Sequence, residues 1–141
     1  MKYFEVKVRY NRIVDNRPKL VTETYAIAAQ TFTDAERKTF DVLSQYADDG
    51  LEVIGEKIAP YDKFIYSGAP KADDKFYLVK YAVVTVDEFT AKEKRERMSV
   101  LVEAVDVETA TDVFNQMPGD ATCRELLSVS ESTVLECFSD L

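Results

Sequence analysis

One pattern of segments occurs twice in this sequence, and this repeat constrains the fold more than any other feature. Residues 3–10 align with 76–83 at an offset of 73 positions, 25–35 with 100–110 at 75, and 58–66 with 129–137 at 71. The offsets drift little and the order of segments is the same, so we interpret the halves as copies of one supersecondary unit. We predict a single domain, residues 1–141, made of two repeats at about 1–67 and 75–141. The stretch 68–74, with its Gly, Pro and Asp residues, is typical of a linker.

Each half opens with two segments that predict a β-hairpin. Large apolar side chains occupy alternate positions, and a period of two places them on one face of a strand. Polar connections at residues 11–19 and 87–97 separate the two segments, and we expect them to be the hairpin loops. The side chains expected to face the core are Phe4, Val6, Val8, Tyr10, Tyr25, Ile27 and Ala29 in the first half, and Tyr77, Val79, Tyr81, Val83, Val100, Val102 and Ala104 in the second.

An amphipathic helix is predicted after each hairpin, over residues 32–46 and 107–117. Short polar residues that can accept the first free N–H groups precede both helices: Thr31 or Thr33 in the first half and Asp106 in the second. Thr33 would form a capping box with Glu36. Residues at helical spacing should form the buried faces. They are Ala35, Phe40, Leu43 and Tyr46 in the first helix, and Ala110, Val113, Phe114 and Met117 in the second.

Further extended segments follow each helix. We expect a third strand at residues 51–59 and 124–130, and a short fourth at 64–66 and 133–138. The sequence therefore predicts the α+β class, with two repeated β-β-α-β(-β) halves. Their antiparallel strands would form one shared sheet or two sheets, covered by two helices and related by a pseudo-twofold axis.

Charge is distributed unevenly along the chain. The formal net charge is −8, yet residues 1–22 hold six basic and two acidic side chains (+4) and residues 75–97 hold six and four (+2), which leaves −14 elsewhere. Cations beside an aromatic residue on a sheet surface are typical of proteins that bind single-stranded nucleic acid. The candidate binding residues in these two hairpins are Tyr3, Lys7, Arg9, Arg12, Arg17, Lys19, Lys92, Lys94, Arg95 and Arg97.

Other interpretations stay open. Mixed charges also keep an exposed sheet face solvated, and basic residues at strand edges discourage aggregation. The acidic remainder could instead bind a basic host protein, as an adaptor or inhibitor. In the second half the outer face of the first strand, with Phe76, Leu78, Lys80 and Ala82, is more apolar and needs cover. The other half, a partner, or a second copy in a homodimer could supply that cover.

Residues typical of catalysis are scarce. The chain has no His and four Gly, and it contains no Gly-rich phosphate-binding motif. The acidic pairs at 48–49, 73–74 and 87–88 lie beside turn residues, where Asp also bonds its own backbone. Cys123 and Cys137 lack metal-ligand spacing. We therefore predict a binding module that is not an enzyme and needs no cofactor or metal.

The sequence also carries signals about location. The N-terminal residues alternate apolar and charged side chains and do not form the apolar run of a signal peptide. Apolar runs stay well short of the roughly 20 residues of a membrane span. We expect a cytoplasmic protein that does not bind membranes.

Three segments carry a resemblance to a known family. The opening at residues 3–10, the helix start at 31–36 and the closing Ser-Val-Ser-Glu-Ser at 128–132 resemble a family of short uncharacterised proteins, a domain of unknown function, from Bacteroides-type gut bacteria and their phages. The likeness spans nearly the whole chain. It implies no activity or site residues, because the family has none assigned. It does imply an intracellular product of a phage or mobile element that acts during replication or against host defences.

Overall fold

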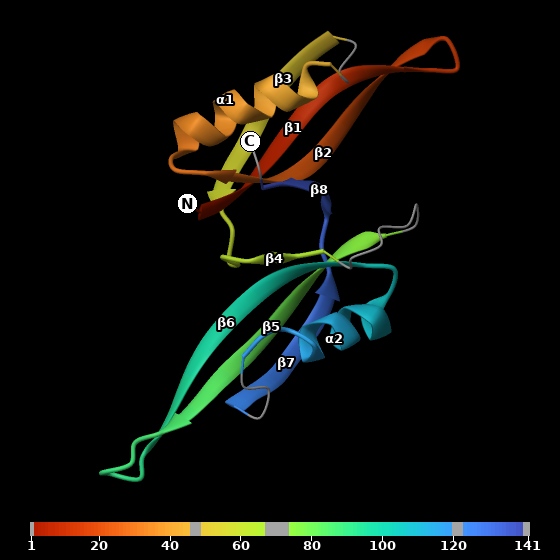
Figure 1. Ribbon diagram of the computed structural model, residues 1–141. Coiled ribbons are helices and arrows are strands. Elements are labelled where there is room, and N and C mark those ends of the chain that lie inside the picture. The colour runs from red at the N-terminus through yellow and green to blue at the C-terminus, as the bar shows by residue number, and fades with distance from the viewer. Residues whose placement is uncertain (1, 46–48, 67–73, 120–122, 140–141) are drawn as a thin grey trace. The chain divides into compact units, whose positions relative to one another are not determined.

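The computed structural model describes residues 2–45, 49–66, 74–119 and 123–139 (Figure 1). Its first half contains β1 (Lys2–Val14), β2 (Arg17–Ala29), α1 (Phe32–Leu43), β3 (Asp49–Ile58) and β4 (Phe64–Ile65). Its second half contains β5 (Lys75–Val86), β6 (Glu93–Ala104), α2 (Val107–Asn115), β7 (Arg124–Glu131) and β8 (Val134–Phe138). The order of elements is the same in both halves, which confirms the predicted α+β class and the β-β-α-β repeat.

The strands form two separate four-stranded sheets. The first has the order β3-β1-β2-β8 and the second the order β4-β6-β5-β7. The prediction of antiparallel pairing holds for the first three strands of each repeat. The fourth strand differs, because β8 lies parallel to β2 and β4 lies parallel to β6. Both sheets are therefore mixed.

The short fourth strands are exchanged between the two halves. β4 follows β3 in sequence but belongs to the second sheet, and β8 follows β7 but belongs to the first. The chain accordingly forms two compact units. Unit 1 contains Met1–Ala59 and Thr133–Leu141, and unit 2 contains Pro60–Ser132.

The core of unit 1 lies between α1 and one face of the first sheet. Alternate β1 residues from Phe4 to Tyr10 pack there with Tyr25, Ile27 and Ala29, as predicted. Thr31 caps α1, since its hydroxyl accepts a hydrogen bond from the Asp34 N–H at 3.1 Å. The prediction of a Thr33–Glu36 capping box is wrong: the Asp34 carboxylate accepts from the Gln30 N–H, which satisfies a further donor at this end.

The buried face of α1 differs from the predicted one. Ala35, Thr39 and Leu43 are buried at i, i+4 spacing, whereas Phe40 is 37% exposed. The Thr39 hydroxyl donates to the Ala35 carbonyl at 2.7 Å, so its burial leaves no unsatisfied donor. Lys38 is also buried, with its ammonium donating to the Ala28 carbonyl at 3.1 Å. Position 46, the predicted end of this helix, lies outside the described residues.

The core of unit 2 repeats this arrangement under α2. Alternate β5 residues pack with Val100, Val102 and Ala104 of β6, and α2 contributes Ala110 and Phe114, as predicted. The Tyr81 and Phe114 rings lie 5.0 Å apart. Asp106 caps α2 through a 2.7 Å hydrogen bond that its carboxylate accepts from the Thr109 N–H.

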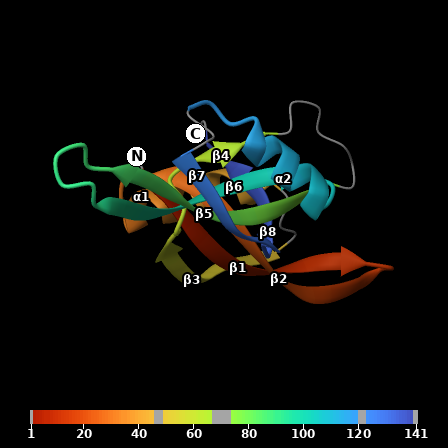
Figure 2. The same ribbon diagram turned by 90° about the horizontal axis from the view of Figure 1, so that it is seen from below.

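Both hairpins are longer than predicted. Residues 11–19 are not a loop, since β1 and β2 stay paired out to Val14 and Arg17 around the two-residue turn Asp15–Asn16. Positive φ values of 52° and 62° at these two residues are those of the tight turns that fit a twisted hairpin. In the second hairpin the loop is residues 87–92 and β6 already begins at Glu93. Figures 1 and 2 show the β1–β2 hairpin extending past α1, and the β5–β6 hairpin past α2.

Candidate nucleic-acid interface

The pairing register sorts the candidate residues of the first hairpin onto two faces. Tyr3, Lys7 and Arg9 share the face opposite α1, as expected from their odd positions in β1. Arg12 lies on the other face, which carries the core residues nearer the helix. Lys19 pairs with Arg12, and Arg17 pairs with Val14, so both belong to that second face as well. The first-half candidates therefore form two groups and not one.

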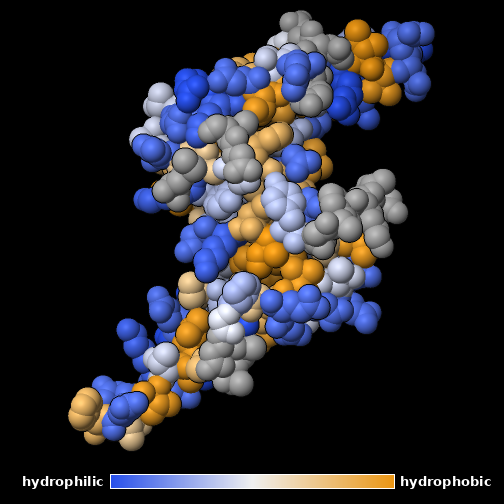
Figure 3. Space-filling view, in the orientation of Figure 1, coloured by the Kyte–Doolittle hydropathy of each residue, from blue (hydrophilic) through white to orange (hydrophobic). Residues whose placement is uncertain are grey.

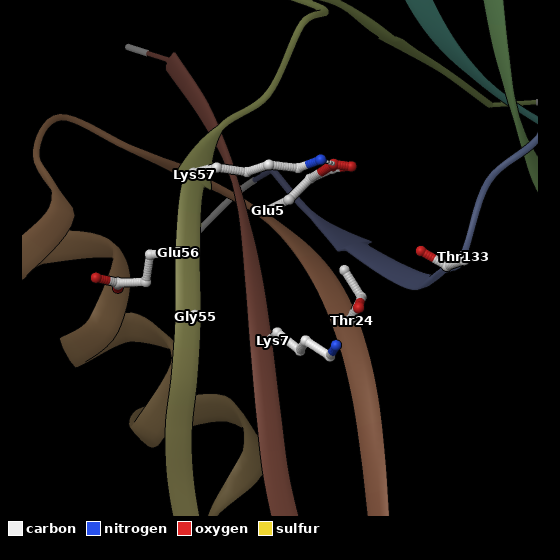
Figure 4. Close-up of a pocket in the computed structure, with 7 residues that line it drawn as sticks. All are labelled: Glu5, Lys7, Thr24, Gly55, Glu56, Lys57 and Thr133. Carbon is white, nitrogen blue, oxygen red and sulfur yellow. Dashed lines mark ion pairs between the residues drawn. The ribbon is translucent and has the colours of Figure 1, made fainter.

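The face opposite α1 carries charges of both signs. Arg9 forms an ion pair with Glu52 of β3 at 2.9 Å, and Lys57 lies 3.9 Å from Glu5. Lys7 lines a shallow pocket of ≈ 390 Å³ in this face together with Gly55 and the hydroxyl residues Thr24 and Thr133 (Figure 4). Because β3 and β1 supply acids between the cations, this face is closer to a solvated mixed surface than to a phosphate-binding one.

Glu56 also lines this pocket but points the opposite way, toward α1 (Figure 4). Burial raises the pKa of its carboxyl, and the nearby Glu36 raises it further. One oxygen of Glu56 is buried with no hydrogen-bond partner among the described residues. This carboxylate is therefore a cost to the stability of unit 1 at neutral pH.

Beyond α1, three cations gather on one face of the β1–β2 hairpin: Arg12, Arg17 and Lys19, which we call the cationic cluster. Arg12 and Lys19 are directly opposite each other in the register, and Arg17 lies two pairs further out, opposite Val14 and on the same face. All three are exposed, and none forms an ion pair with any residue that the structure describes. Like charges directly opposite in a hairpin are destabilising, so folding alone does not favour this arrangement.

A hydrogen-bonded group of three side chains lies next to the cationic cluster, on the same face of the hairpin but nearer α1. The Tyr10 hydroxyl donates to one oxygen of Glu23 at 2.8 Å, and the Tyr25 hydroxyl donates to the other. Burial raises the pKa of Tyr25 strongly, and the Glu23 carboxylate raises it further. Glu23 keeps its negative charge while it accepts these two bonds, but it forms no ion pair with Arg12, Arg17 or Lys19.

In the second hairpin the candidate cations are mixed with acids. Arg95 and Arg97 lie opposite Val84 and Ala82, on the face away from α2, while Lys94 lies opposite Thr85 on the other face. Arg95 forms an ion pair with Glu125 of β7. Lys92 lies in the loop, where its carbonyl accepts from the Asp87 N–H at 2.9 Å. Residues 84–97 hold four basic and four acidic side chains, so the outer part of this hairpin has no net charge.

The sequence analysis did not single out the most exposed of the large hydrophobic residues that the structure describes. Phe89 is 98% exposed, at the end of the β5–β6 hairpin. Ile13 and Leu20 of the first hairpin are also exposed, by 61% and 59%. Figure 3 shows apolar atoms among hydrophilic ones at both hairpin ends. The sequence did contain a signal for this exposed side chain: an aromatic residue stands between the turn-forming Asp87 and the basic stretch that follows.

The other sequence features have local roles. Asp87, from one of the acidic pairs, accepts hydrogen bonds from the Phe89 and Thr90 N–H groups, while positions 48 and 73 lie outside the described residues. The described residues include no group of three or more potential metal ligands. Within unit 2, Phe76 is buried and Phe64 of β4 stacks on it at 5.6 Å, so this chain supplies part of the cover predicted for that face.

Comparisons with known proteins extend these observations. In the described part of the chain, no helix is long and apolar enough to cross a membrane. No curated protein and no solved structure matches the chain. One family described as a domain of unknown function, DUF4494, matches residues 2–140. Because that match covers nearly the whole sequence, the chain belongs to the DUF4494 family.

Proposed function

We propose that this protein is a non-enzymatic binding module that contacts single-stranded nucleic acid through its two hairpins, with the first providing the main electrostatic contact. The observation that carries the proposal is the cationic cluster. Arg12, Arg17 and Lys19 lie on one face of a two-stranded ribbon, in a protein whose net charge is −8. A surface that gathers like charges at a cost in stability is typical of a site for an anionic ligand.

The shape of the hairpin supports an extended ligand. The pairing of β3 with β1 ends at Asn11. Beyond that point, β1 and β2 pair with each other and with no other strand that the structure describes. Their side chains therefore reach solvent on both faces. A narrow ribbon of this kind can follow a flexible phosphate backbone, and each phosphate that it neutralises releases a counterion.

The setting belongs to the same proposal. We place the protein in the cytoplasm, as the product of a phage or mobile element of Bacteroides-type bacteria, where single-stranded intermediates arise during replication. The resemblance of residues 3–10, 31–36 and 128–132 to short proteins of such bacteria and their phages supports this setting.

Fluorescence polarisation with a labelled oligothymidine of about 20 nucleotides, and with its RNA counterpart, tests the proposal. The titrations run from about 20 mM to about 200 mM salt. Wild-type protein should bind with an affinity that falls steeply with salt. A variant with Arg12→Gln, Arg17→Gln and Lys19→Gln should show a log–log salt slope smaller by about 2, since each single-strand phosphate contact contributes about 0.7.

The matched control removes three charges elsewhere, through Arg37→Gln, Lys63→Gln and Lys75→Gln. Arg37 lies on α1 and already pairs with Asp34 and Asp41, so its loss should leave the slope unchanged. Equal slopes in the two triple variants would refute a role for the cationic cluster. If wild-type protein does not bind even at low salt, the proposal fails, and a basic host protein bound by the acidic surface becomes the alternative to test.

A further inference from the structure

The turn that carries Phe89 is well organised. The Asp87 carboxylate accepts hydrogen bonds from the N–H groups of Phe89 and Thr90, at 2.8 and 3.2 Å. The Asp87 carbonyl accepts from the Ala91 N–H at 2.8 Å, and the Asp87 N–H donates to the Lys92 carbonyl at 2.9 Å. Ala91 closes the turn with a φ of 55°. The backbone position of Phe89 is therefore fixed before any ligand binds.

The Phe89 side chain takes no part in this turn. The residue contributes its N–H group, which any residue but proline could supply. The residue is 98% exposed, so its ring gains none of the stabilisation that burial of such a side chain provides. Turn positions of this kind favour small polar residues. Neither turn geometry nor folding accounts for a phenylalanine here.

We infer that Phe89 stacks on an unpaired base, and that this contact makes the protein prefer single strands to duplexes. The inference rests on the proposed function, and it assigns a different task to each hairpin. The first hairpin holds three cations that form no ion pair with any described residue, and it contributes an electrostatic, salt-dependent contact. The second hairpin has no net charge between residues 84 and 97 but presents an aromatic face.

Stacking suits this geometry. A base in a single strand is free to leave its neighbours and lie on an aromatic ring, whereas a base inside a duplex is already stacked on both sides. A ring held at the end of a projecting hairpin offers both of its faces to such a base. Because every base has a π-face, the contact should show little sequence preference.

The test uses the full-length protein with Phe89→Trp, Phe89→Ala and Phe89→Leu. The chain contains no Trp, so Phe89→Trp places a single tryptophan at the hairpin end. Its fluorescence should fall when the labelled oligothymidine binds, as stacked indole is quenched. Phe89→Ala should weaken binding to the single strand by about 5- to 150-fold with the salt slope unchanged, and should leave binding to a duplex of the same length unchanged.

Phe89→Leu separates stacking from a purely apolar contact. Leucine keeps an apolar side chain without a π-face, so the stacking role predicts a loss close to that of Phe89→Ala. Retained affinity with leucine would overturn stacking in favour of a purely apolar contact with the nucleic acid. Val86→Ala is the control, because Val86 is also exposed on this hairpin and has no ring.

The outcomes separate this inference from the proposed function. Salt-dependent binding by wild-type protein, with Phe89→Ala binding equally well and no quenching of the tryptophan, would overturn the stacking role and leave the cationic cluster in place. Absence of wild-type binding at low salt would overturn both.

Discussion

Replacing Tyr25 with phenylalanine should destabilise unit 1 at neutral pH, by an amount that shrinks at alkaline pH. The Tyr25 side chain is only 8% exposed, and its hydroxyl donates to the Glu23 carboxylate. A hydrogen bond to a charged acceptor contributes about 1.5–3 kcal/mol. The variant leaves Glu23 with the Tyr10 hydroxyl as its remaining tyrosine donor. We expect the free energy of unfolding to fall by about that amount at pH 7.

The pH dependence follows from the pKa of Tyr25. Burial and the Glu23 carboxylate raise this pKa in the folded protein, while in the unfolded chain a tyrosine loses its proton near pH 10. Above about pH 10 the unfolded state therefore binds fewer protons than the folded state, and stability that is fully present below this pH is lost as the pH rises. The slope for one residue reaches about 1.4 kcal/mol per pH unit. Phenylalanine does not titrate. The difference in the free energy of unfolding between wild type and variant should therefore shrink at the same rate as the pH rises.

Urea unfolding, followed by circular dichroism at about pH 8, 10 and 11, measures this difference in the free energy of unfolding. Tyr66→Phe serves as the control, because Tyr66 is 49% exposed and lies in unit 2. Its effect should be small at each pH. A difference between wild type and Tyr25→Phe that stays constant from pH 8 to 11 would refute the proposed origin of the Tyr25 stabilisation.

Four further substitutions test the fold of unit 1. Thr31→Ala should lower the free energy of unfolding by about 1 kcal/mol, because it removes the cap of α1. Thr33→Ala should change this free energy by less than about 0.5 kcal/mol. Thermal unfolding of the two variants measures the difference. Ile27→Ala, at a fully buried position, should cost about 2–5 kcal/mol in urea unfolding. Glu56→Gln should stabilise the protein at pH 7, because burial and Glu36 raise the pKa of Glu56, and stability from such a group is lost as the pH rises through its folded pKa. The extra stability of the Glu56→Gln variant should disappear below about pH 4. Equal stability of variant and wild type at pH 7 would contradict this prediction.

The repeat and the core could be predicted from the sequence because both rest on local periodicity. A period of two on the central strands and a turn signal between them fix which side chains point inward. The outer ends of the hairpins lack that signal, since both faces of a two-stranded ribbon meet solvent and the apolar alternation stops. Residues 11–19 therefore resemble a loop, although Asp15–Asn16 marks the two-residue turn.

The buried face of α1 was harder to predict because a polar residue occupies it. Hydrophobicity favours Phe40 over Thr39, but Thr39 satisfies its hydroxyl within the helix and fits against the sheet. The candidate site shows a similar limit. The sequence cannot indicate that Arg9 is paired, because Glu52 lies 43 positions further along the chain and reaches it through the β1–β3 pairing.

The exchanged fourth strands bear on how such a protein can arise and assemble. A chain with a single repeat and this topology would have to take its fourth strand from a second copy. The free energy of its folding would then depend on protein concentration. Here the two repeats are covalently joined, so each strand is supplied at an effective concentration set by the connecting segment. Expressed separately, residues 1–66 and 74–141 would each carry a strand that belongs to the other's sheet. The two fragments should therefore refold together as a noncovalent pair and not as two independent proteins.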